Sequence, residues 1–153
     1  MYRKILVAYN GTSESRSALY ECVRLAPGPS AEIHLLVVVI PPSPALAGEV
    51  PFVIDREEDL IAAKRQMENE LLVGHRILSD AGLQVVNHLE VGEPIDVIGK
   101  LANELGIELV IVGHSRHQSW AMRWWRSSTD ALLVEKVRCS ILVAADAKQG
   151  SLK

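Results

Sequence analysis

The sequence has few of the features that mark membrane, secreted or disulfide-rich proteins. Only two cysteines occur among its 153 residues, Cys22 and Cys139, and they lie far apart. No apolar run approaches the roughly 20 residues that span a bilayer, and the apolar run near the N-terminus is too short for a signal peptide. We therefore expect a soluble cytoplasmic protein with reduced thiols and no membrane partner.

The sequence also lacks a strong excess of either charge. It has 16 Lys and Arg against 19 Asp and Glu, a formal net charge of -3, so no general attraction to nucleic acid is expected and any anion site must be local. Hydrophobic residues make up 48% and charged residues 23%, which is typical of one compact domain with a substantial core. We predict a single domain over residues 1–146, followed by a polar tail over 147–153.

Continuous apolar runs alternate with segments of helical periodicity along the whole domain. An apolar run that both faces of a sheet can bury is typical of a parallel strand, and the alternation favours right-handed crossovers. The fold class predicted is α/β, a single doubly wound sheet of five parallel strands with helices on both faces. The strands are expected at 5–9, 32–40, 83–92, 107–113 and 140–145, and the helices at 12–26, 55–81, 93–106 and 127–137.

Polar, glycine-containing turns follow the first and the fourth expected strands. Tyr9, Asn10 and Gly11 follow the first, and Gly113 and His114 follow the fourth. In doubly wound sheets ligands bind beyond the carboxyl ends of the strands, so these residues are candidate walls of one site. Asn before Gly is also a common turn pair, and both interpretations of Asn10 stay open.

Ser127 and Ser128 stand at the start of the last expected helix. They can serve as simple N-capping residues. The same helix N-terminus, with its free N–H groups, can also receive a phosphate.

Five segments from the start to the end of the domain are informative together: "KILVAYNGTSESRSAL", "LLVVVI", "VGEP", "LVIVG" and "CSILV". Through these segments the chain resembles the universal stress protein family over nearly its whole length. It implies a doubly wound domain related to adenine-nucleotide-binding folds. In the ATP-binding branch of that family, Gly, two residues, Gly, nine residues, Gly and then Ser or Thr form a phosphate loop. The equivalent positions in this chain are Gly113, Arg116, Arg126 and Ser127.

The same resemblance implies two nucleoside contacts. ATP-binding members place an Asp at the first strand end, where this chain has Asn10, and contact adenine through the backbone of the second strand, near Val38.

The two arginines remove what the loop glycines supply. A glycine has no Cβ, so its backbone can take positive φ and its N–H can approach a phosphate, whereas arginine allows neither at low cost. We expect a regulatory stress-response module that binds ATP weakly or not at all; no cofactor is certain, and ATP with Mg²⁺ is the candidate. The alternative is a nucleotide-responsive switch that binds ATP or another phosphate-bearing ligand through Arg116, Arg126 and the N-terminus of the last helix.

The residues between the fourth expected strand and the last expected helix do not favour metal binding, nucleic-acid binding or catalysis. His114 and His117 have no adjacent Cys or carboxylate cluster, so no metal site is expected. The three tryptophans, Trp120, Trp124 and Trp125, are better explained by packing or a protein interface than by nucleic-acid stacking. No catalytic set is evident, and the protein is not expected to be an enzyme.

The last expected strand is apolar and should lie at the edge of the sheet. An unpaired flat edge strand is a template for association, and members of the resembled family commonly pair through it. We expect a homodimer through Ile141, Leu142, Val143 and Ala144, and protein partners remain open.

Overall fold

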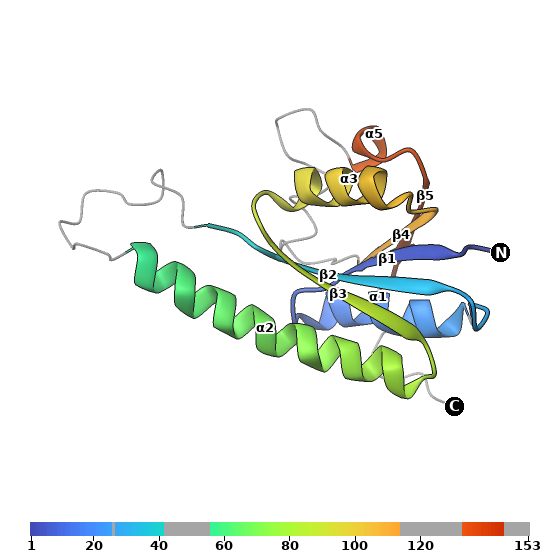
Figure 1. Ribbon diagram of the computed structural model, residues 1–153, viewed down its shortest axis with the longest axis horizontal. Coiled ribbons are helices and arrows are strands. Elements are labelled where there is room, and N and C mark those ends of the chain that lie inside the picture. The colour runs from blue at the N-terminus through green and yellow to red at the C-terminus, as the bar shows by residue number, and fades with distance from the viewer. Residues whose placement is uncertain (26, 42–55, 114–132, 146–153) are drawn as a thin grey trace.

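The computed structural model describes residues 1–25, 27–41, 56–113 and 133–145. Five parallel strands form one sheet in the order β3-β2-β1-β4-β5 (Figure 1). The strands are β1 (Lys4–Ala8), β2 (Glu32–Val39), β3 (Gln84–Val91), β4 (Leu109–Gly113) and β5 (Ser140–Ala144). The predicted sheet is therefore confirmed, and each predicted strand lies within a few residues of its observed position.

Helices cover both faces of the sheet, as predicted. One face packs against α1 (Ser13–Arg24) and α2 (Arg56–Asp80), and the other packs against α3 (Pro94–Leu105) and α5 (Leu133–Lys136) (Figure 1). The long helix predicted at 55–81 is α2. Of the helix predicted at 127–137, the described residues contain only the end, as α5; the rest, like residues 42–55 and the predicted tail, lies outside them.

Side chains of β1 alternate between two apolar core layers. Ile5, Val7 and Tyr9 join the layer under α1 and α2, whereas Leu6 and Ala8 join the layer under α3 and α5. All five are at most 2% exposed. Because both faces of β1 are buried, its sequence is a continuous apolar run rather than an alternating one.

The central position of β1 decides which strand ends meet. β1 pairs with β2 from Lys4↔Glu32 to Ala8↔Leu36 and with β4 from Ile5↔Leu109 to Val7↔Ile111. The carboxyl ends of β2, β1 and β4 therefore lie next to one another, which is the arrangement that a shared ligand site requires. β3 and β5 form the two edges.

Within the described residues, no helix is both long and apolar enough to cross a membrane.

Candidate functional site

The turn after β1 is fixed by the side chain of Asn10. Its Oδ1 accepts hydrogen bonds from the backbone N–H of Thr12 at 3.1 Å and from the Thr12 hydroxyl at 2.6 Å. Thr12 in turn caps α1, because its Oγ1 accepts from the backbone N–H of Ser15. The Asn10 side chain thus serves the turn, and its oxygen is engaged there.

Tyr9 and Gly11 both lie against Glu70 of α2. The hydroxyl of Tyr9 donates to Glu70 Oε2 at 3.2 Å, and the Tyr9 side chain is 1% exposed. Burial is the main cause that raises the pKa of this phenol, with Glu70 adding to it and Arg16 opposing it. Tyr9 was a candidate binding residue, but its side chain belongs to the core, because it follows Ile5 and Val7 in the same alternation.

Gly11 has φ +86°, and a Cβ built on it would lie 2.6 Å from Glu70 Cδ. The left-handed backbone favours glycine at this position, whereas the Glu70 side chain could rotate away from a Cβ. Its role in the structure is to let the chain turn tightly beside α2.

Gly113, the last residue of β4, lies directly against the first turn of α1. A Cβ there would clash with the Glu14 carbonyl oxygen and lie 2.6 Å from the carbonyl carbon. Since these are backbone atoms, no side-chain rotation can relieve the contact. The close approach of strand and helix thus accounts for this glycine without a ligand.

A cleft of about 230 Å³ opens between the carboxyl end of β2, the turn after β1 and the N-terminal half of α2. It brings together Asn10 and Val38, two of the predicted site residues from neighbouring strands. Its lining is mostly apolar, with the amides of Asn10 and Gln66 as polar groups. The lining residues are Asn10, Val38, Val39, Ile40, Ala63, Gln66 and Met67.

The α2 wall of this cleft was not among the predicted site residues. Ala63, Gln66 and Met67 are three and four residues apart and so share one helix face. The signal in the sequence was a polar glutamine between the apolar positions 63 and 67, at the start of a long helix. Gly113 does not line the cleft, and the candidates His114, Arg116, Arg126, Ser127 and Ser128 lie outside the described residues.

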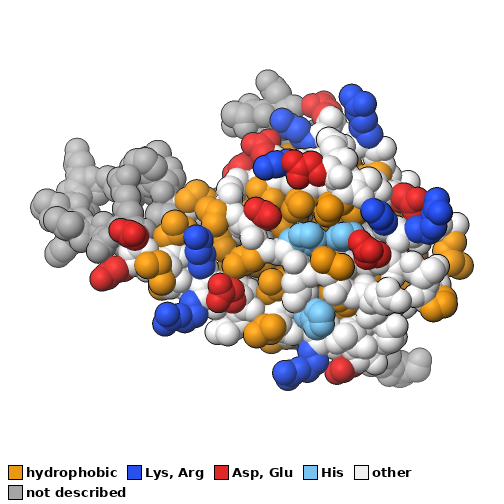
Figure 2. Space-filling model, viewed as in Figure 1, with side chains coloured by type: hydrophobic (Ala, Val, Ile, Leu, Met, Phe, Trp, Pro, Cys, Tyr) orange, Lys and Arg blue, Asp and Glu red, His pale blue; other side chains and the backbone are white. Residues whose placement is uncertain are grey.

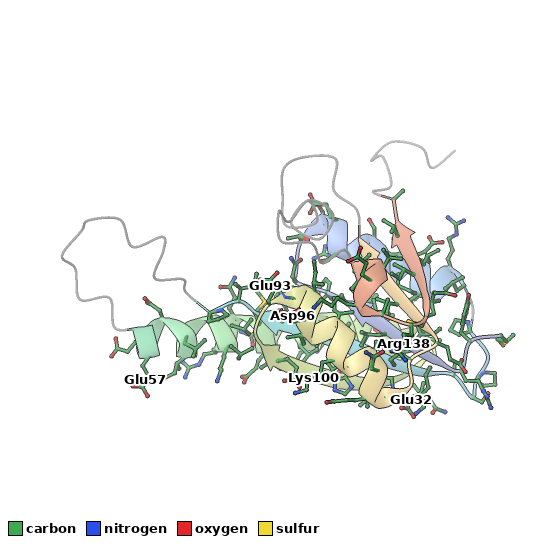
Figure 3. All side chains as sticks on the ribbon, turned by 90° about the horizontal axis from the view of Figure 1, so that it is seen from above. Glu32, Glu57, Glu93, Asp96, Lys100 and Arg138 are labelled. Atoms are coloured by element: carbon green, nitrogen blue, oxygen red, sulfur yellow. The ribbon has the colours of Figure 1, made fainter. Side chains whose placement is uncertain are left out.

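A second hollow at the carboxyl end of the sheet has the wrong charge for phosphate. It has a volume of about 260 Å³ between the end of β3 and α3. Figure 3 shows Glu93, Asp96 and Lys100 along α3, and Glu90 and Glu104 also line it. The Lys136 ammonium pairs with Asp96 at 3.3 Å, so the remaining carboxylates leave the hollow acidic. Within the described part of the chain, no group of three His, Cys, Asp or Glu side chains can hold a metal ion.

Comparison with known proteins supports the relationship that these features suggest. A relative from Staphylococcus haemolyticus that carries the universal stress protein name is 29% identical over 145 residues, covering 93% of this chain and 84% of the relative. The hypothetical protein MJ0577 superposes with a TM-score of 0.76 at 22% identity, covering 97% of this chain and 99% of that one. A universal stress protein in complex with cAMP superposes with a TM-score of 0.67 at 18% identity, covering 95% and 99%.

These structural likenesses concern the fold, whereas the family is decided by the sequence. The model of the universal stress protein family matches residues 1–145, which is almost the whole chain. This chain therefore belongs to the universal stress protein family.

Proposed function

We propose that this protein is a regulatory stress-response module whose cleft binds the nucleoside part of an adenine nucleotide and holds the phosphates only weakly. The observation that carries the proposal is the cleft that joins Asn10 and Val38. A solved universal stress protein of the same fold contains cAMP, an adenine nucleotide with a single phosphate. No catalytic step is assigned.

The lining of the cleft suits a flat base. Val38, Ile40, Ala63 and Met67 supply apolar walls, and apolar walls with a few placed polar groups are usual in small-molecule sites. Its 230 Å³ is below the roughly 300 Å³ at the lower end of such sites, so the phosphates must extend beyond it.

The polar groups of the cleft suit a sugar or the edge of a base. The Asn10 oxygen accepts two hydrogen bonds within its own turn, which leaves its amide N–H groups as the natural donors to a ligand. Gln66 offers both a donor and an acceptor from the opposite wall.

Weak phosphate binding follows from the sequence beyond Gly113. Arg116 and Arg126 occupy the positions that the family's ATP-binding branch fills with glycine. With their Cβ atoms in place, main-chain N–H groups lose their close approach to a phosphate.

Calorimetric titration with adenosine, AMP and ATP with Mg²⁺ tests this proposal. We expect AMP to bind about as tightly as ATP, and we expect the double variant Arg116→Gly, Arg126→Gly to bind ATP at least tenfold more tightly, about 1.4 kcal/mol. If the arginines themselves hold phosphate, the same variant weakens ATP binding and added salt weakens it in the unaltered protein. Absence of binding by all three ligands would overturn the cleft assignment.

We also propose that the protein forms a homodimer through β5. The strand pairs with β4 on one side only among the described residues, and Ile141, Leu142 and Val143 are partly exposed. Ala144 is 3% exposed, so of the four residues predicted for the interface its side chain contributes least. A Val143→Lys variant is expected to halve the mass measured by light scattering, whereas the matched change Val86→Lys on the other edge strand is not.

The proposed location is the cytoplasm. Cys22 and Cys139 are both free, as expected for a reducing compartment.

A further inference from the structure

Two histidines and a carboxylate form a connected chain on the face of the sheet that α3 covers. His34 Nδ1 lies 2.9 Å from His88 Nε2, and His34 Nε2 lies 2.6 Å from Glu32 Oε1. Glu32 and His34 point to the same face because they are two residues apart on β2. His88 lies on edge strand β3, diagonally across from His34, which pairs with Val86.

The inner histidine is in an unusual environment. His34 is 3% exposed, although ionisable side chains are seldom fully buried without partners. Its Nε2 is close to the Glu32 carboxylate, but the oxygen lies off the N–H direction, so that nitrogen has no well-formed hydrogen bond. Figure 2 shows histidine side chains beside hydrophobic ones on the side of the molecule where β3 lies. The neutral ring thus already stands in a poorly satisfied position.

A neutral pair satisfies the contact between the two rings. One nitrogen must donate and the other must accept, and two neutral imidazoles can do this. A first proton keeps one donor and one acceptor between the rings and has Glu32 nearby to balance the charge, but burial opposes it. A second proton leaves two N–H groups facing each other across 2.9 Å, with two positive charges and no acceptor.

The surrounding charges come from three strands. Burial is the largest cause that lowers the pKa of His34, and Lys4 on β1 acts in the same direction while Glu32 opposes it. Burial and the neighbouring His34 lower the pKa of His88, opposed by Glu90 and Glu32. From α3, the apolar side chains of this layer include Ile98 and Leu101.

We propose that Glu32, His34 and His88 form a proton-binding site that makes the attachment of edge strand β3 to β2 dependent on pH. Among the described residues β3 pairs with β2 and with no other strand, and it packs against α2, so as an edge strand it can separate without opening the rest of the sheet.

The direction of the pH dependence follows from which state of the strand binds protons more readily. Once β3 separates, His88 on the released strand and His34 left on β2 take up protons at the ordinary histidine pKa of about 6.5, whereas the paired rings resist protonation. Attachment of β3 is therefore complete above about pH 6.5 and is lost as the pH falls below it. Uptake of two protons changes the opening equilibrium by up to about 100-fold per pH unit, against tenfold for one.

Hydrogen exchange measured peptide by peptide between pH 7.5 and 5.0 tests the proposal. Protection factors for residues 84–91, corrected for intrinsic exchange, are expected to fall steeply below pH 6.5 while those for residues 4–8 stay unchanged. A parallel response of the two peptides would overturn the proposal. The proposed nucleotide site is not involved, because no nucleotide is added.

Three variants make the test specific. His88→Gln keeps a hydrogen-bonding group but removes one proton site. The protection factors of residues 84–91 should then change by about tenfold per pH unit instead of up to about 100-fold. Glu32→Gln removes the balancing charge and should move the loss to higher pH. His75→Gln is the control, since His75 lies on α2 with its Nδ1 2.8 Å from Asn87 Oδ1, on the other face of β3. Unchanged pH dependence in both His88→Gln and Glu32→Gln, or its loss in His75→Gln, would contradict the assignment.

Discussion

The carboxyl ends of β1 and β4 lie side by side but are built in opposite ways. The end of β1 is held by a side chain, because the Asn10 oxygen accepts two hydrogen bonds from Thr12. The end of β4 depends on the absence of a side chain, because the Glu14 carbonyl group occupies the place of a Cβ at Gly113. The first end should tolerate any residue that keeps the oxygen, and the second should tolerate none but glycine.

The largest effect is expected at Gly113. In Gly113→Ala the new methyl group meets backbone atoms, so α1 must shift, and we expect a loss of about 3 kcal/mol in the free energy of unfolding. Urea denaturation measures it. Gly28→Ala is the control, because its Cβ would meet only the flexible Met1 Sδ at 3.1 Å, and its change should stay below about 1 kcal/mol. Equal losses in the two variants would remove the contrast between the strand ends.

A smaller effect is expected at Asn10, where the chemistry of one atom decides the result. Asn10→Ala leaves the Thr12 N–H without its acceptor and should lower the free energy of unfolding by about 1–2 kcal/mol. Asn10→Asp keeps the oxygen beside the N-terminus of α1 and should stay within about 1 kcal/mol of the original protein. Thermal unfolding of both variants provides the measurement, and an Asp variant as unstable as the Ala variant would exclude this role of the oxygen.

Tyr9 tests how β1 is anchored just before its turn. Tyr9→Phe removes the hydrogen bond to Glu70 and should reduce stability at neutral pH by about 1 kcal/mol. Because the pKa of Tyr9 is raised in the folded protein, its contribution is complete below pH 10 and is lost as the pH rises above it.

Circular dichroism between pH 9 and 12 should therefore show a shallower alkaline loss in Tyr9→Phe than in the unaltered protein. Tyr20→Phe, at a side chain 56% exposed, should leave the alkaline loss unchanged. A profile for Tyr9→Phe that matches the unaltered protein would argue against a coupled ionisation at this position.

The smallest effect on stability is expected for Gln66→Ala, on the α2 wall opposite Asn10. Gln66 is exposed, so the free energy of unfolding should change by less than about 0.5 kcal/mol. The affinity for AMP should nevertheless fall about fivefold, the loss of one hydrogen bond. An unchanged affinity would exclude Gln66 as a hydrogen-bonding contact to AMP and leave Asn10 as the polar group of this cleft that binds it.

Local patterns predicted the fold because the three central strands β1, β2 and β4 are buried on both faces. The run from Ile5 to Tyr9 and the run in β4 are typical of buried strands, and their alternation with helices indicated a parallel sheet. The order of the strands in the sheet was not predicted. The alternation along β1 also contained the information that Tyr9 belongs with Ile5 and Val7, although its position at the strand end suggested a ligand contact.

Features that depend on the relative placement of distant elements could not be predicted in this way. Gln66 lines the cleft only because α2 extends past the end of β2, a property of tertiary packing. His34 and His88 meet because of the β2–β3 register, which no local pattern fixes. Whether Asn10 serves the turn or a ligand depended on the distance to Thr12.

The central place of β1 in the sheet has a consequence for folding while the chain is synthesised on the ribosome. β1 is the first strand to be synthesised, and it meets β2 early, but its other neighbour β4 begins only at Leu109. Until then the growing chain presents an apolar strand with one row of free backbone groups, the kind of surface that chaperones cover and aggregates recruit. A pause in synthesis between α3 and β4 should therefore carry the greatest risk of aggregation for this chain.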